Sequence, residues 1–277
     1  MARWAVNEYL SKTFPVLLTL AMAFFFQLAV EGIRLPPPAV TPIPEEGGQE
    51  VSQLFTPAPY VNALMVVTAM FIGSMAIIAI LRHRKILRLF ILSIFFTSAT
   101  AVTTFYLLIL TDLDANIVLG LAVAAAALTL AGISSSSEVA GLLASSYIAA
   151  SAGVVVGSSM PFWTSLVLLL AISVYDSVAV FKGHLKTLVE VDTSSIRGLV
   201  VDFRGVSIGL GDLFFYTVLY SFANTNFGIL PATAAFIGII AGYLITLRLA
   251  RERPVFPGLP ITILTALILS VTVYLLI

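Results

Sequence analysis

The sequence contains no cysteine and only two histidines among its 277 residues. The absence of cysteine excludes disulfide bonds, thiol catalysis and cysteine-ligated metal sites. Both histidines, His83 and His184, lie in basic segments between the apolar runs. The sequence therefore argues against an intramembrane serine–histidine protease and against an H-E-x-x-H metalloprotease. No metal and no other cofactor is expected.

Charged residues are also scarce. They make up 10% of the chain, whereas a soluble domain carries about 25%. Hydrophobic residues make up 60%, and the mean hydropathy is +1.07. This composition indicates a polytopic membrane protein. The formal net charge is zero, so nucleic acid is not an expected partner.

Long apolar runs predict an all-α membrane protein. A helix needs roughly 20 apolar residues to cross a bilayer. Nine runs meet this requirement, and short polar or basic segments separate them. They cover residues 14–33, 60–81, 87–110, 116–133, 138–157, 161–181, 206–225, 231–249 and 260–277.

Basic residues predict the orientation of these spans. With the N-terminus in the cytoplasm, 13 of the 14 Lys and Arg residues fall on the cytoplasmic side, and only Arg34 falls outside. This bias follows the positive-inside rule and predicts that the C-terminus lies on the outer side. Joining the fourth and fifth spans into one would place the last three basic clusters on the wrong side.

The first apolar run has the position of a signal peptide. A proline run follows it, and no small-residue cleavage site is evident, so we expect a retained span. The proline-rich residues 34–59 are expected to form a solvated, semi-extended connector on the outer side. The fourth and fifth spans are rich in Ala, Gly and Ser, which favours close helix packing.

Two aspartates, Asp176 and Asp212, lie within the predicted sixth and seventh spans. A charge at the bilayer centre costs about 2.5–3.5 kcal/mol, and such residues mark functional sites. Asp176 lies six residues before Lys182, which is about 9 Å along a helix. Asp212 lies eight residues after Arg204, or at most about 12 Å. Both carboxylates are therefore expected at similar depth on neighbouring helices.

A single buried aspartate often serves only to hydrogen-bond a neighbouring helix. Two aspartates at matched depth on consecutive spans favour a shared function instead. A pair of carboxylates supplies the acid and the base of a hydrolytic reaction. Ion or proton coupling also uses intramembrane carboxylates and stays open as an alternative.

Short motifs accompany the two aspartates. Tyr175 precedes Asp176, and the segment Gly209-Leu210-Gly211 precedes Asp212. The paired glycines indicate a place where backbone approaches backbone or substrate. The segment Pro257-Gly258-Leu259-Pro260 opens the ninth span. Sequence alone favours a proline turn that starts a helix, and its cytoplasmic position allows it to form a third wall of one site.

These three elements together resemble the presenilin and signal peptide peptidase family of intramembrane aspartyl proteases. That family carries Tyr-Asp in its sixth span, Gly-x-Gly-Asp in its seventh and Pro-Ala-Leu before its ninth. The stretches 209–216 (G-L-G-D-L-F-F-Y) and 257–263 (P-G-L-P-I-T-I) are especially similar to presenilin. Nine spans with the N-terminus inside also match presenilin, whereas signal peptide peptidases are expected in the inverted orientation.

The resemblance implies a catalytic pair and a set of substrate-positioning residues. The catalytic residues would be Asp176 and Asp212, and the positioning residues would be Tyr175, Gly209, Leu210, Gly211, Pro257, Gly258 and Leu259. The chain departs from the family at Gly258, where alanine is usual; glycine keeps the small size but loosens the backbone. We expect a five-span scaffold in residues 1–157 and a catalytic four-span unit in residues 158–277. Residues 182–205 lack the long apolar stretch of the autocleaved presenilin loop, so no endoproteolytic activation is expected.

The predicted function is hydrolysis of a peptide bond within a transmembrane helix of a substrate protein. Asp176 and Asp212 would share one proton around a water. One would activate the water as a base, and the other would donate to the carbonyl oxygen and then to the leaving nitrogen. Residues 199–204 are expected to form either a strand that pairs with the unwound substrate or a flexible loop. Tyr175 is expected either to orient Asp176 by a hydrogen bond or to pack on the substrate.

Two other functions would use the same residues. The first is a cation leak channel or proton-coupled transporter, and the second is a prepilin-peptidase-like aspartyl protease that cuts at the membrane boundary. The expected partners of the intramembrane protease are single-pass transmembrane substrates and membrane lipid, without an obligatory accessory subunit. The expected location is a prokaryotic, archaeal cell membrane.

Overall fold

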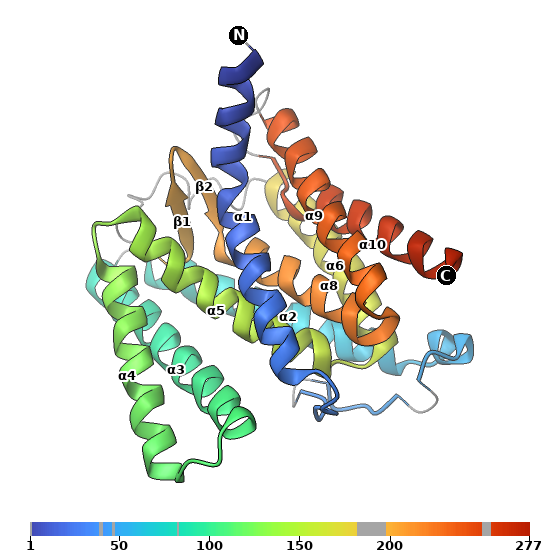
Figure 1. Ribbon diagram of the computed structural model, residues 1–277, viewed down its shortest axis with the longest axis horizontal. Coiled ribbons are helices and arrows are strands. Elements are labelled where there is room, and N and C mark those ends of the chain that lie inside the picture. Colours follow the sequence, from blue (N-terminus) through green and yellow to red (C-terminus); the bar gives the residue numbers. More distant parts are fainter. Residues whose placement is uncertain (1, 39–40, 46–47, 82, 182–197, 251–255) are drawn as a thin grey trace. The chain divides into compact units, whose positions relative to one another are not determined.

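The computed structural model describes residues 2–38, 41–45, 48–81, 83–181, 198–250 and 256–277. Within these residues the chain forms nine α-helices, one short 3-10 helix and a two-stranded sheet (Figure 1). The helices are α1 (Ala2–Val30), η1 (Val51–Phe55), α2 (Ala58–Ile80), α3 (Arg84–Leu110), α4 (Ala115–Ser134), α5 (Glu138–Ser159), α6 (Phe162–Phe181), α8 (Leu210–Phe227), α9 (Ile229–Ala250) and α10 (Leu259–Leu276). The predicted all-α membrane fold is confirmed.

Eight of the helices in the described residues are long and apolar enough to cross a membrane. The ninth, α8, has 18 residues, and polar side chains such as those of Asp212, Asn224 and Asn226 lower its mean hydropathy. The break between α4 and α5 falls at residues 135–137, where the sequence predicts separate fourth and fifth spans. Helix α1 ends at Val30, three residues before the predicted end of the first span, because Gly32 adopts a positive φ of 78° in the turn that follows.

The predicted seventh span is wrong at its start, because residues 206–209 form a strand. Strand β1 (Val200–Phe203) pairs antiparallel with β2 (Val206–Gly209). The two residues between them, Arg204 and Gly205, have φ values of 48° and 76°. A two-residue type I′ turn requires positive φ at both central positions. Of the two expectations for residues 199–204, the strand is therefore the one that forms, and its partner in the structure is β2.

The outer connector is more ordered than predicted. The half-buried Glu45 accepts the backbone N–H groups of Trp163 at 3.1 Å and Thr164 at 2.9 Å, and the Thr164 hydroxyl also donates to it. Free N–H groups at a helix start need such partners. Glu45 thus caps α6 from a distant segment. The prediction of a wholly solvated connector is wrong at this residue.

The chain divides into two compact units. The first contains Met1–Glu31, Ile80–Gly153 and Val191–Thr217, and the second contains Gly32–Ala79, Val154–Glu190 and Val218–Ile277. The predicted functional division at residue 157 stays a prediction.

In the first unit, α3 packs along α4 and contacts α1 (Figure 1). The hairpin is joined to α1 by stacking of Phe203 on Phe14, with ring centroids 5.4 Å apart. The start of α8 is held against α5, because the hydroxyl of Thr217 donates to the carbonyl of Ala149 at 2.8 Å. Gly153 permits this approach, since an added Cβ would lie 1.8 Å from the Thr217 Oγ1 atom. These contacts fix the helix that carries Asp212.

In the second unit, α9 and α10 pack closely and α10 also contacts α6 (Figure 1). The α9–α10 contact depends on two glycines. A Cβ added at Gly238 would lie 2.5 Å from Cα of Ala266, and one added at Gly242 would lie 2.6 Å from Cα of Thr262. Small residues at such positions let helix backbones approach within a membrane. The packing therefore fixes the beginning of α10, where the third sequence motif lies.

Candidate active site

Asp176 lies near the C-terminal end of α6, where its side chain is half-buried. Its Oδ2 atom accepts a hydrogen bond of 3.0 Å from the backbone N–H of Leu259. The backbone of Gly258 also hydrogen-bonds this carboxylate. Both donors belong to the third sequence motif, which is distant in the chain. The structure thus brings the first and third motifs together.

The hydrogen bond has a clear structural origin. Leu259 is the first residue of α10, and its N-cap position is occupied by Gly258, which has no side chain to cap the helix. The first N–H groups of a helix have no intrahelical acceptor, and the positive end of the helix dipole attracts carboxylates. Asp176 therefore takes the role of a capping residue from a neighbouring helix. The two main-chain donors fix the orientation of its carboxylate.

The turn that carries these donors is firmly packed. Pro257 is buried, the side chain of Leu259 is 4% exposed, and a proline occupies the first turn of α10. Proline at this position requires no backbone N–H and already has a helical φ. Gly258 has φ −82° and ψ −35°, a conformation that residues other than glycine also adopt. The glycine at this position is therefore not required by the backbone conformation.

Tyr175 is half-buried beside Asp176 on α6. Its hydroxyl makes no hydrogen bond to the described residues. A hydrogen bond that orients Asp176 is thus supplied by the α10 turn rather than by Tyr175. Packing on a substrate stays a prediction for this ring.

Asp212 lies in the first turn of α8, directly after the hairpin of the first unit, and is half-buried. Gly209 ends β2 and pairs with Val200, and the N–H of Leu210 donates to the carbonyl of Leu199 at 2.8 Å. The sheet ladder therefore continues to the first residue of α8. This strand-to-helix junction sets the position of the second aspartate.

The two glycines of the second motif have different surroundings. A Cβ added at Gly209 would lie 3.7 Å from the carboxyl carbon of Asp212, which is ordinary contact. Gly211 is exposed, and a Cβ added there would have no other atom within 4 Å. The absence of a side chain at Gly211 leaves open space one residue before the carboxylate. Packing within the protein does not require a glycine at this position.

The site residues thus form two groups, each within one unit. Asp176, Tyr175 and the 257–259 turn belong to the second unit, and Asp212, residues 209–211 and the hairpin belong to the first. Among the described residues, no three His, Cys, Asp or Glu side chains cluster in a way that could hold a metal ion. The sequence analysis placed residues 206–209, which form strand β2, at the start of the seventh span, and it did not predict the capping role of Glu45. The Arg-Gly pair at 204–205 was the available signal for the hairpin.

Comparisons with known proteins identify the class of this fold. Two solved structures of a presenilin family intramembrane aspartate protease, in space groups C222 and P2, superpose with TM-scores of 0.70 and 0.63. They are 18% and 20% identical to this chain and cover 97% and 96% of it, which corresponds to 99% and 97% of their own chains. The chain thus has the fold of the presenilin-family proteases, as the resemblance of its motifs predicts.

A match to a particular curated protein adds sequence similarity. Presenilin-B of Dictyostelium discoideum is 35% identical over 116 residues, which are 38% of this chain. The match covers 24% of Presenilin-B, about a quarter of its length. No family model matches the chain.

Proposed function

We propose that this protein is an intramembrane aspartyl protease that hydrolyses peptide bonds within transmembrane helices of substrate proteins. The observation that carries the proposal is the Asp176–Leu259 hydrogen bond of 3.0 Å. Main-chain amides at the start of α10 hold this carboxylate within an otherwise apolar helix. A carboxylate is costly at membrane depth, and capping a neighbouring helix does not require one there. The fold likeness and the match to Presenilin-B support the same proposal.

In this proposal Asp176 and Asp212 act together on one water molecule. The carboxylate that is ionised removes a proton from the water, which attacks the peptide carbonyl carbon. The protonated carboxyl donates its proton to the carbonyl oxygen. When the tetrahedral intermediate collapses, the carboxyl that took the proton from the water donates it to the leaving nitrogen, the other carboxylate regains a proton from a hydroxyl of the intermediate, and the C–N bond breaks. Sharing of one proton by two carboxyl groups is the arrangement used by aspartic proteases.

A peptide bond in a helix is protected by its own hydrogen bonds, so the substrate must unwind before it is cut. We propose that residues 199–204 bind the unwound segment by strand addition. An exposed strand edge supplies main-chain donors and acceptors for such pairing. The ladder ends three residues before Asp212, which brings a bound strand toward the catalytic carboxylate. The open space at Gly211 lies on this path.

The remaining features of the proposal concern the cellular setting. The substrates are single-pass membrane proteins, and no accessory subunit is needed for cleavage. The absence of cysteine, and of a long apolar stretch in residues 182–205, favours a prokaryotic, archaeal membrane as the location. The prepilin-peptidase-like alternative does not account for the third motif, whose amides here contact Asp176.

The decisive experiment uses Asp176→Asn and Asp212→Asn separately in purified protein. Each variant should abolish cleavage of a model transmembrane substrate in detergent, because asparagine can neither accept nor donate the required proton. Gel filtration and thermal unfolding should match those of the wild type, which shows that folding is intact. Substantial cleavage by either variant would contradict the dyad. Cation flux in liposomes that persists in the presence of an aspartic-protease transition-state analogue would favour the channel or transporter instead.

A further inference from the structure

A small cavity lies in the first unit between the α4–α5 turn and strand β1. Its volume is about 220 Å³. A single water needs only about 10–15 Å³, whereas sites for small organic ligands usually measure about 300–1,000 Å³. The cavity is therefore larger than a single water needs and smaller than most sites for organic ligands, a size suited to one long side chain.

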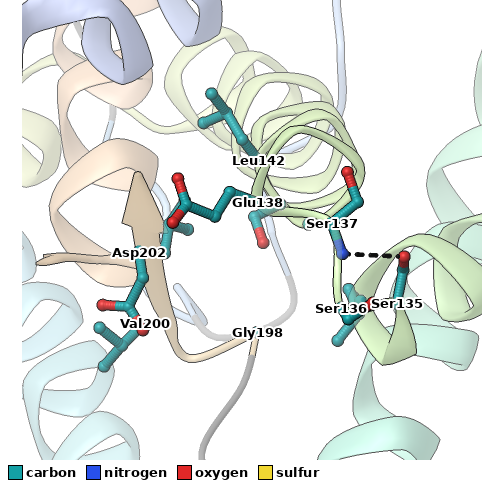
Figure 2. A pocket seen from close by; sticks show the side chains of 12 residues that line it. Ser135, Ser136, Ser137, Glu138, Leu142, Gly198, Val200 and Asp202 are labelled. Carbon is teal, nitrogen blue, oxygen red and sulfur yellow. Dashed lines mark hydrogen bonds between the residues drawn. The ribbon is translucent and has the colours of Figure 1, made fainter. Parts of the chain in front are cut away.

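The cavity has a polar entrance and a mostly apolar base. Ser136, Ser137 and Glu138 are exposed at the entrance, where the turn meets α5. Figure 2 shows Glu138 extending from the start of α5 toward the strand that carries Asp202. The residues at the base are buried, and they include Ile133, Leu142, Ser145 and Val201. The lining residues extend from Glu138 to Ser145 on α5, a distance of about 10 Å along the helix.

The charged side chains that line the cavity in the described part of the chain are both negative. Glu138 and Asp202 contribute carboxylates, and among the described residues no Lys, Arg or His lines the cavity. Each carboxylate has one hydrogen-bond partner among the described residues: Glu138 accepts the backbone N–H of Arg204 at 3.0 Å, and Asp202 accepts the hydroxyl of Ser207. An ionised carboxylate has about four acceptor positions, so both retain capacity for a bound donor. The guanidinium of Arg204 lies over the ring of Phe203, 5.4 Å from its centroid.

A second and independent observation comes from Ser145. Its side chain is 1% exposed and lines the cavity, yet its hydroxyl makes no hydrogen bond to the described residues. Because Ser145 lines the cavity, its hydroxyl oxygen can accept a hydrogen bond from a donor group that enters. The base of the cavity therefore provides an acceptor as well as space.

We propose that this cavity binds the ammonium or guanidinium side chain of a basic residue that follows the transmembrane segment of the substrate. Strand β1 connects the cavity to the catalytic region, because Val200 and Val201 line it and pair with Gly209 and Ile208 of β2. A segment that runs along β1 from Asp212 would pass the cavity. The predicted topology places this region on the cytoplasmic side, where membrane proteins carry Lys and Arg beside their spans. The inference rests on the proposed protease function and adds a recognition feature to its substrates.

A metal ion is a less suitable occupant. Calcium takes six to eight oxygen ligands and favours several carboxylates, and among the described residues only two carboxylates line the cavity. An ammonium of a lipid headgroup has the same chemistry as a lysine side chain. The test below therefore uses a non-ionic detergent without phospholipid, so that the peptide is the only source of the cation.

The test compares two fluorescent peptides that share one apolar segment of about 20 residues. They differ only in the next three residues, which are Lys-Lys-Lys or Gln-Gln-Gln. Fluorescence anisotropy measures their binding to the full-length protein. The wild type should bind the lysine peptide roughly tenfold more tightly, as expected for hydrogen bonds to charged groups. Equal affinity for the two peptides would overturn the proposal.

Variants then locate the preference. The double variant Glu138→Gln/Asp202→Asn keeps both hydrogen-bond acceptors and removes both charges, so it should lose the preference while binding the glutamine peptide normally. Ser145→Ala should weaken lysine-peptide binding roughly threefold. Asp114→Asn is the control, because it removes a charge at the other end of α4 and asparagine is an equally good N-cap residue. It should leave the preference unchanged.

Three results would overturn the inference. The first is an unchanged preference in the double variant, and the second is an equal loss in Asp114→Asn, which would indicate net charge alone. The third is stoichiometric calorimetric binding of Ca²⁺ alone that the double variant abolishes, which would assign the cavity to a metal ion. Cleavage of both peptides is followed separately. If neither peptide is cut while the preference persists, the cation site stands and the protease function fails.

Discussion

The carboxylate of Asp176 and the backbone N–H of Leu259 are joined by a hydrogen bond of 3.0 Å between residues 83 positions apart in the chain. This bond links a carboxylate within one apolar helix to the first turn of another. It gives the Pro257–Leu259 segment a defined task, since the segment holds the proposed catalytic group in place. A small displacement of a catalytic group can lower a rate by about 100-fold.

Removal of this N–H should lower cleavage. Leu259→Pro deletes the donor, and proline is tolerated at the first position of a helix. The substitution also removes a buried side chain, so Leu259→Ala is the matched control, because it truncates the side chain and keeps the N–H. We expect kcat for a model transmembrane substrate to fall at least about tenfold further in the proline variant than in the alanine variant. Equal rates in the two variants would show that the hydrogen bond has no role.

Replacement of Gly258 by alanine, the residue usual in the presenilin family, should be tolerated. Gly258 already has helical φ and ψ values, so Gly258→Ala introduces no backbone strain. A gain of about 0.4–1 kcal/mol from reduced freedom of the unfolded chain is opposed by the poorer capping of alanine relative to glycine. The free energy of unfolding should therefore change by less than about 1 kcal/mol, with cleavage retained. A loss of activity above tenfold, measured on folded protein, would contradict this interpretation.

The close packing of α9 on α10 predicts a strong effect at Gly242. Its added methyl would lie 2.6 Å from Cα of Thr262, a backbone atom that cannot rotate away. Overpacking of this kind costs about 1–3 kcal/mol, so Gly242→Ala should lower the apparent melting temperature in detergent. It should also displace the start of α10 and reduce cleavage. Gly73→Ala is the control, because nothing lies within 4 Å of a Cβ at that helical position. A similar response of the two variants would contradict the packing argument.

The sequence was sufficient for much of this fold because the deciding signals are local. Apolar runs predicted the helices, and basic residues separated α4 from α5. The first four residues of the predicted seventh span were assigned wrongly, because Val206–Gly209 continues an apolar run and only the Arg-Gly turn indicates a hairpin. The capping of α6 by Glu45 was not predictable, because its partner Thr164 is 119 residues away. The Asp176–Leu259 contact likewise depends on tertiary packing, and the sequence indicated only that the two motifs lie on the same side of the membrane.

The contribution of Glu45 can be measured directly. Glu45→Ala leaves the N–H groups of Trp163 and Thr164 without their carboxylate acceptor. Loss of a helix cap costs about 0.5–2 kcal/mol, so the variant should unfold at a lower temperature in detergent. Glu50→Ala is a suitable control from the same loop, because among the described residues its exposed carboxylate accepts only the hydroxyl of Ser52, at 3.3 Å. Equal destabilisation by both changes would contradict a specific capping role for Glu45.

The open space at Gly211 predicts a change in substrate binding without a change in stability. Gly211→Ala places a methyl group where no other protein atom lies within 4 Å, and alanine has the higher helix propensity by up to about 1 kcal/mol. The melting temperature should therefore stay constant or rise. If the unwound substrate passes this point beside Asp212, the methyl should exclude it and raise KM severalfold. Gly120→Ala, at another open helical position in the same unit, should leave KM unchanged. An unaltered KM in Gly211→Ala would show that the substrate does not pass this point.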